Sequence, residues 1–213
     1  MNFHLQKLLP SSAYFDQAIA IYEQSLPSNE RQPGSVIEDR LNQGLCTLYG
    51  VMEDDAVVGM MVIWIFEDTP FTFLDYLAVH QDYRGKGIGE FCMQKIKEEF
   101  AKMHKSMLIE VEDPDFGEDR VTKIRRIRFY EKCGSKWLAN TPYIIPALDG
   151  TDPTPMQILI IANEEIAQLD GASVRDVIRR IYRLVYEKSE DDLLLNSFIN
   201  KVGDTILMQK YPE

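Results

Sequence analysis

The strongest constraint on the fold of this chain is a glycine-rich turn placed between a strand-like run and a helix-like run. The turn carries glycines at 85, 87 and 89. Residues 71–79 before it are almost continuously apolar, as in a buried strand. After it, apolar residues recur at spacings of three and four from Ile88 to Met103, which predicts one buried face of a helix. A consecutive strand, turn and helix indicate an α/β (α+β) chain.

The turn also predicts an anion site. Glycines at 85, 87 and 89 can adopt backbone angles closed to other residues, so that successive N–H groups converge on a phosphate. The first turn of the following helix adds unpaired N–H groups and a partial positive charge. The spacing is neither the dinucleotide fingerprint nor a Walker loop. A plain tight turn with glycines for steric reasons remains open from this segment alone.

Composition excludes several classes of protein. The 213 residues carry 23 Lys and Arg against 34 Asp and Glu, a net charge of −11, which argues against nucleic-acid binding and suits cationic or amine partners. The longest apolar run, 57–66, is about half of a membrane span, and residues 1–10 lack the pattern of a signal peptide. We therefore expect a cytoplasmic protein that does not contact a membrane.

The three cysteines show no metal-site or disulfide pattern. Their spacing is unpaired and they have no histidine neighbours, so reduced thiols and no metal are expected. They are Cys46, Cys92 and Cys133.

The order of the elements predicts a mixed, mostly antiparallel central sheet flanked by helices. Expected helices are 12–26, 35–43, 88–104 and 120–133, and expected strands are 45–52, 56–66, 71–79, 107–112, 136–139 and 156–161.

Beyond residue 161 the chain predicts a C-terminal helical extension. One helix is expected to open at Ser173 with Asp176, and another at Ser189. Their apolar faces must pack against the rest of the chain or against a second copy of it, which would form a homodimer. We predict two parts, 1–161 and the extension 162–213.

Two separated motifs resemble the GNAT superfamily of acetyl-CoA-dependent N-acetyltransferases over about residues 1–161. Arg84, Gly87 and Gly89 match the family's Arg/Gln-x-x-Gly-x-Gly/Ala, and Leu77-Ala78-Val79 matches the strand before it. Farther on, Phe129-Tyr130-Glu131-Lys132-Cys133-Gly134 matches the second motif. The resemblance is nearest to the ribosomal-protein N-terminal acetyltransferase branch.

The resemblance implies acetyl-CoA as co-substrate, with no metal. It implies that the backbone of Leu77, Ala78 and Val79 bonds the pantetheine arm. It also implies that the turn cradles the pyrophosphate through Arg84, Gly85, Lys86, Gly87, Ile88, Gly89 and Glu90.

Two carboxylates are candidates for the base that delivers a neutral amine, since a free amine near pKa 10 is mostly protonated at neutral pH. Glu110 in Ile109-Glu110-Val111 resembles the Leu-Glu-Val whose Glu is the base of the ribosomal-protein branch. The alternative for Glu110 is a solvent-exposed strand residue. Asp75 is the rival base, and alternation predicts that it shares a face with Phe73, Leu77 and Val79. Its alternative is a hydrogen-bonded polar residue that fixes the strand.

Tyr130 is the candidate acid, because the family carries there the tyrosine that serves the coenzyme sulfur. A phenol near pKa 10 can stabilise a thiolate whose thiol has a pKa near 8.5. Its alternative is aromatic packing.

The chain departs from the family pattern in two places. Lys123 and Arg126 stand where the family has an Asn and a small residue, and 112–119 is an inserted loop with five carboxylates. The basic residues of 120–132 could meet the adenosine phosphate of CoA or pair with this loop. The loop could be simply solvated or could attract cationic amines. Calcium is disfavoured, because the glycine is one place early for an EF-hand.

The resulting expectation is an N-acetyltransferase working by direct attack in a ternary complex, on a small cationic amine or a protein N-terminus. The alternative is a catalytically silent, CoA-binding regulatory or scaffold protein.

Overall fold

The computed structural model describes residues 2–26, 31–148 and 152–212. The chain divides into two compact units, Met1–Lys105 and Ser106–Glu213. Each unit builds its own run of antiparallel strands covered by helices.

In the described part of the first unit, the strands lie in the order β1-β2-β3-β4, all antiparallel neighbours. They are β1 (Phe3–Leu8), β2 (Thr47–Glu53), β3 (Ala56–Ile65) and β4 (Phe71–Val79). Residues 57–64 of β3 are all buried, as expected for a central strand covered on both faces. The predicted strands β2, β3 and β4 are confirmed, whereas β1 was not predicted.

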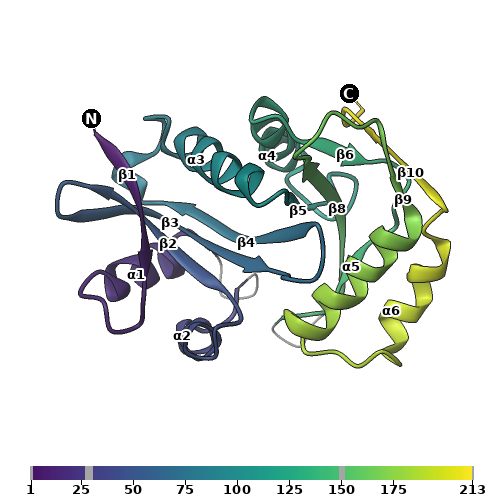
Figure 1. Ribbon diagram of the computed structural model, residues 1–213, viewed down its shortest axis with the longest axis horizontal. Coiled ribbons are helices and arrows are strands. Elements are labelled where there is room, and N and C mark those ends of the chain that lie inside the picture. The colour runs from purple at the N-terminus through teal and green to yellow at the C-terminus, as the bar shows by residue number, and fades with distance from the viewer. Residues whose placement is uncertain (1, 27–30, 149–151, 213) are drawn as a thin grey trace. The chain divides into compact units, whose positions relative to one another are not determined.

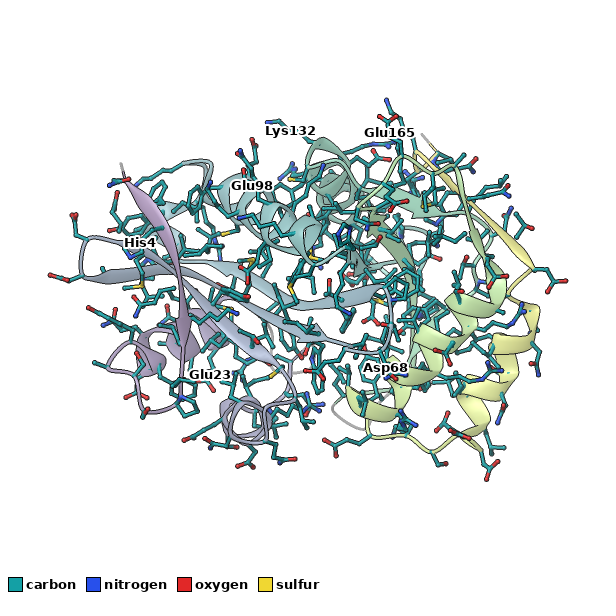
Figure 2. All side chains as sticks on the ribbon, viewed as in Figure 1. His4, Glu23, Asp68, Glu98, Lys132 and Glu165 are labelled. Carbon is teal, nitrogen blue, oxygen red and sulfur yellow. The ribbon has the colours of Figure 1, made fainter. Side chains whose placement is uncertain are left out.

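Helices cover both faces of this sheet. Figure 1 shows α1 (Phe15–Ser25) and α2 (Gly34–Asn42) on one face and α3 (Ile88–Lys102) on the other. Tyr22 of α1 packs edge-on against Tyr76 of β4, with ring centroids 4.7 Å apart, and Phe91 of α3 packs against Phe3 of β1 at 5.9 Å. The polar sides face outward, as Figure 2 shows for Glu23 on α1 and Glu98 on α3. The three predicted helices are confirmed.

The second unit contains the antiparallel strand order β5-β8-β6-β10-β9, with β7 paired to β8. Their bounds are β5 (Ser106–Glu112), β6 (Lys136–Leu138), β7 (Ile144–Ile145), β8 (Thr154–Ile161), β9 (Gln168–Asp170) and β10 (Thr205–Gln209). The mostly antiparallel sheet flanked by helices is therefore confirmed. The short strands β7, β9 and β10 were not predicted.

The helices of the second unit are α4 (Arg120–Lys132), α5 (Gly171–Leu184) and α6 (Leu193–Phe198). Their starts correct two predictions. Asp170, not Ser173, caps α5, because its Oδ2 accepts the Ser173 N–H at 2.8 Å. Asp192, not Ser189, caps α6, because its Oδ1 accepts the Leu195 N–H at 2.9 Å. Ser189 instead supplies the carbonyl of the turn that precedes this cap.

The extension 162–213 packs on the remainder of the second unit. It contributes β9, β10 and the short helix η2 (Ile199–Lys201) in addition to α5 and α6, and β10 pairs with β6. Arg128 of α4 donates to the carbonyls of Tyr211 and Pro212 and so holds these two residues against α4. The division at residue 161 and a homodimer remain predictions.

Within the described ranges, no helix has the length and apolarity needed to cross a membrane. The same residues contain no group of three or more His, Cys, Asp and Glu side chains that could hold a metal ion. Among the described residues, Cys46, Cys92 and Cys133 are not joined in a disulfide.

Candidate active site

The glycine turn has the predicted geometry at two of its three glycines. Gly85 and Gly87 have φ of +75° and +79°, a region that L side chains rarely adopt. A Cβ added at either would meet no atom within 4 Å, so the backbone angle alone requires glycine there. Gly89 differs: it lies inside α3 and has no positive φ. The freedom to adopt such backbone angles, which the sequence offers at all three glycines, is therefore used at Gly85 and Gly87 and not at Gly89.

The turn presents an exposed backbone at the start of a 15-residue helix. Gly87 is the N-cap of α3 and has no side chain to accept the first-turn N–H groups. Ile88 is buried beside it and fixes the start of the helix. Arg84 is exposed and is held by its Nε bond to the carbonyl of Val79 at 3.2 Å, and the ammonium of Lys86 stands 4.4 Å from the ring of Tyr83. The N–H groups of a helix start, a helix dipole and two cations together can bind a pyrophosphate.

A β-bulge lies at Asp75 on β4. Val62 pairs with Tyr76 and Ile63 pairs with Leu74, so Asp75 is the extra residue between them. The bulge reverses the alternation beyond it: Phe73 is opposite Trp64, whereas Leu77 is opposite Met61 and thus lies on the other face. The prediction that Asp75 shares one face with Phe73, Leu77 and Val79 is therefore wrong for Leu77 and Val79.

Asp75 lies beside a buried arginine and tryptophan. The indole N–H of Trp64 donates to its Oδ2 at 2.9 Å, and the guanidinium of Arg40 from α2 stands 5.3 Å from the Trp64 ring. Burial raises the pKa of Asp75 from its usual value to about 6, against the lowering effects of the Trp64 hydrogen bond and the Arg40 charge. A carboxyl with a pKa near 6 suits proton transfer near neutral pH. Sequence reasoning identified Asp75 but neither neighbour.

In the second unit, Glu110 on β5 is not a solvated strand residue. It is half-buried, and both of its oxygens accept hydrogen bonds: Oε1 from the hydroxyl of Tyr143 and Oε2 from the hydroxyl of Tyr186 at 2.5 Å. The alternative of simple exposure is therefore wrong. Burial, with the charge and hydrogen bond of Glu110, raises the pKa of Tyr143 well above its usual value, so this phenol stays a donor at neutral pH.

The two tyrosines belong to an aromatic cluster that sequence reasoning missed. Tyr182 packs edge-on against Tyr186 and Tyr143, with centroids 5.7 Å and 6.3 Å apart, and Phe198 of α6 lies 5.9 Å from Tyr143. One signal for it was available. Tyr182 and Tyr186 continue the apolar stripe of α5 at a spacing of four, and buried tyrosine hydroxyls need partners.

Tyr130 lies on the buried side of α4 with Ile127 and is 8% exposed. Its ring meets that of Phe129 edge-on at 5.0 Å. Its role as acid remains a prediction.

The two residues that depart from the family pattern hold the inserted loop. The ammonium of Lys123 donates to the carbonyl of Phe116 at 2.5 Å and lies 3.5 Å from Glu112. Arg126 pairs with Glu112 at 3.2 Å, and Arg120 pairs with Asp115 at 3.2 Å. Pairing between the basic helix and the acidic loop is confirmed, whereas a contact with the adenosine phosphate remains a prediction.

Comparison with known proteins identifies the family. The model of the Acetyltransferase (GNAT) family matches residues 14–135. This chain belongs to the GNAT acetyltransferase family. The match includes β4, the glycine turn, Glu110 and Tyr130, which are the residues that carried the resemblance in the sequence.

Among curated proteins, the chain is 34% identical over 98 residues to YjbC of Bacillus subtilis (strain 168), whose name places it among the acetyltransferases. The match covers 46% of this chain and 48% of that protein, so it spans about half the length of the relative.

Two solved structures show the same fold. A GNAT-family protein of Bacteroides thetaiotaomicron aligns with a TM-score of 0.74 at 20% identity, over 87% of this chain and 99% of that one. The ribosomal-protein-S18-alanine N-acetyltransferase of Escherichia coli aligns with a TM-score of 0.56 at 15% identity, over 78% of this chain and 99% of that one.

Proposed function

We propose that this GNAT protein is an acetyl-CoA-dependent N-acetyltransferase that moves an acetyl group to a primary amine by direct attack. The observation that carries the proposal is the turn at Gly85 and Gly87, whose left-handed, exposed backbone lies at the start of α3, where a helix presents its first N–H groups. Such a turn favours a pyrophosphate over a singly charged ligand, because several N–H groups and the helix dipole act together.

The donor side consists of residues 77–79 and 84–90. The turn would hold the pyrophosphate through its N–H groups, with Arg84 and Lys86 supplying positive charge. The backbone of Leu77, Ala78 and Val79 would align the pantetheine arm along β4. CoA as the bound group is supported by a structural neighbour, a Bacillus subtilis acetyltransferase solved in complex with CoA, which aligns with a TM-score of 0.54 at 15% identity.

On the acceptor side we assign Glu110 as the group that takes the proton from the attacking amine. Each carboxylate oxygen accepts one tyrosine hydroxyl. A carboxylate oxygen can accept more than one hydrogen bond, so an ammonium would bind there as a further donor. Asp75 is the second candidate, supported by its pKa of about 6. Tyr130 would donate a hydrogen bond to the departing thiolate.

The acceptor we propose is a small cationic amine or a protein N-terminus, in a cytoplasmic protein. The net charge of −11 supports a cationic acceptor, since an acidic surface raises the local concentration of cations. A protein N-terminus is supported by the fold shared with the S18-alanine acetyltransferase.

The test has two stages. Calorimetry measures acetyl-CoA binding, and thiol release then measures transfer to a panel of polyamines, amino sugars and peptides with free N-termini. Transfer that Tyr130→Phe and Glu110→Gln both reduce supports the proposal. Binding without transfer to any amine would favour the alternative of a silent CoA-binding protein, and absence of binding would reject both.

A further inference from the structure

The C-terminal extension reaches the proposed catalytic carboxylate directly. Tyr186, 76 residues after Glu110 in the chain, donates to Oε2 of Glu110 at 2.5 Å. Tyr143, from the segment before β7, donates to Oε1. Each carboxylate oxygen therefore accepts a bond from a different phenol, which fixes the plane of the carboxylate as well as its position.

Hydrogen bonds hold the segment that carries Tyr186. Tyr186 lies in the turn that ends α5, where Glu187 takes a left-handed φ of +55° and the N–H of Lys188 bonds the carbonyl of Tyr182 at 2.9 Å. This bond reaches six residues back along the chain and closes the turn that follows α5. One helical turn earlier, the hydroxyl of Tyr182 donates to the carbonyl of Ile144.

The other end of α5 is anchored as well. Arg175 donates to the carbonyl of Val202 at 2.8 Å, and Gly171 lies so close to Gly203 that an added Cβ would be 1.8 Å from its carbonyl oxygen. Contacts therefore hold α5 at both ends, and the phenol of Tyr186 reaches Glu110 from the segment at its anchored C-terminal end.

We propose that Tyr186 is a positioning residue for Glu110, so that the C-terminal extension forms part of the acceptor side of the active site. The proposal rests on the proposed function, in which Glu110 receives the amine proton. Two phenol donors stabilise the ionised carboxylate and hold it in one orientation. An ammonium bound there loses its proton to a carboxylate held in a single orientation.

The groups that surround Glu110 are consistent with this role. The extension contributes Tyr182 and Tyr186, and Tyr143 completes the set of phenols. On β5 itself Glu112 lies two residues away, and its charge is paired with Lys123 and Arg126 of α4. On β8 the cross-strand partner of Glu110 is the uncharged Ile158.

The test compares Tyr186→Phe with the matched control Tyr182→Phe. Both remove one hydroxyl and leave the ring, Tyr182 in the last turn of α5 and Tyr186 in the turn that follows it, but of the two only Tyr186 bonds Glu110. We expect Tyr186→Phe to lower kcat/KM for the amine by about tenfold and to move the acid limb of its pH profile up by about one unit. Loss of the donor makes the ionised carboxylate harder to form, which gives this sign. KM for acetyl-CoA should not change.

Tyr182→Phe should leave the acid limb unmoved, and Tyr143→Phe should move it in the same direction as Tyr186→Phe. Thermal unfolding reports whether each variant folds. An unmoved limb in Tyr186→Phe, or an equal shift in Tyr182→Phe, overturns the inference. Failure of the wild-type protein to acetylate any amine overturns the proposed function instead, so the two failures are distinguishable.

Discussion

The indole N–H of Trp64 donates a 2.9 Å hydrogen bond to Asp75, the residue that forms the bulge of β4. The bond crosses two neighbouring strands and joins a fully buried ring to the one carboxylate of β4. Bulges redirect side chains out of strict alternation. Here the bulge places Asp75 on the same side of the sheet as Trp64, whose ring lies 5.3 Å from the guanidinium of Arg40 of α2.

The first prediction concerns how pH affects stability through Asp75. Its pKa is raised from 3.8 to about 6 on folding, so the favourable contribution of its protonated form is complete below pH 3.8 and is lost as pH rises through 6. Asp75→Asn keeps an acceptor for Trp64 but carries no charge. We expect it to raise the free energy of unfolding at pH 8 by on the order of 2 kcal/mol, and by progressively less toward pH 4.

Urea unfolding between pH 4 and pH 8 measures this difference, with Asp55→Asn at the exposed β2–β3 turn as control. A gain in stability for Asp75→Asn that is the same at both ends of the range would contradict a raised pKa.

The second prediction separates the two candidate bases. Trp64→Phe removes the hydrogen bond that lowers the pKa of Asp75, so that pKa should rise above about 6. The free energy of unfolding of Trp64→Phe is compared with that of the double variant Trp64→Phe/Asp75→Asn at each pH. The pH at which this difference is half complete should be higher than in the same comparison made with Trp64 present. Since we assign the amine proton to Glu110, the acid limb of kcat/KM should not move. If the acid limb of kcat/KM does move in Trp64→Phe, Asp75 and not Glu110 takes the proton from the amine.

The strand, turn and helix of residues 71–102 could be predicted because their signals are local. Apolar periodicity identifies the strand and the helix, and a left-handed turn with an exposed backbone requires glycine at 85 and 87. The basic helix and the acidic loop could likewise be paired, since opposite charges stand within a few residues of each other.

The bulge and the phenols around Glu110 could not be predicted in the same way. The bulge depends on the register between β3 and β4, so the alternation of residues within β4 alone carries no signal for it. The contact between Glu110 and Tyr186 joins residues 76 apart in the chain. The caps were misplaced for a simpler reason: aspartate and serine both suit an N-cap, and Asp170 lies just three residues before Ser173.

The third prediction tests the anion-binding turn with two glycines of similar geometry. Gly87 and Gly44 have φ of +79° and +70°, and an added Cβ would meet nothing within 4 Å at either. Gly87→Ala and Gly44→Ala should therefore cost a similar amount of stability, about 1 kcal/mol. Only Gly87→Ala should also weaken acetyl-CoA binding, by at least about tenfold, because it disturbs the N–H groups of the turn. Calorimetry measures the affinity for acetyl-CoA. Equal affinities in the two variants would show that the turn does not bind acetyl-CoA.

The fourth prediction concerns the inserted loop. Lys123→Met removes the ammonium that donates to the carbonyl of Phe116 and pairs with Glu112. We expect a loss of about 1 to 2 kcal/mol of stability and faster chymotrypsin cleavage at Phe116. Lys132→Met, which changes an exposed lysine on the same helix, is the control. Equal cleavage rates in the two variants would show that Lys123 does not hold the loop.

The last prediction tests the anchor of α5 with two glycines that face each other across one contact. A Cβ at Gly171 would lie 1.8 Å from the carbonyl oxygen of Gly203 and 2.9 Å from backbone atoms of Asp204, whereas a Cβ at Gly203 would lie 3.7 Å from its nearest neighbour. Backbone atoms cannot move aside as a flexible side chain does. Gly171→Ala should therefore displace the start of α5 and lower the free energy of unfolding by about 3 kcal/mol or more, whereas Gly203→Ala should lower it by less than about 0.5 kcal/mol.

Because Tyr186 lies in the turn that follows α5, Gly171→Ala should also lower kcat/KM for the amine while leaving acetyl-CoA affinity unchanged. Equal unfolding free energies for the two alanine variants would show that this close approach does not fix the helix.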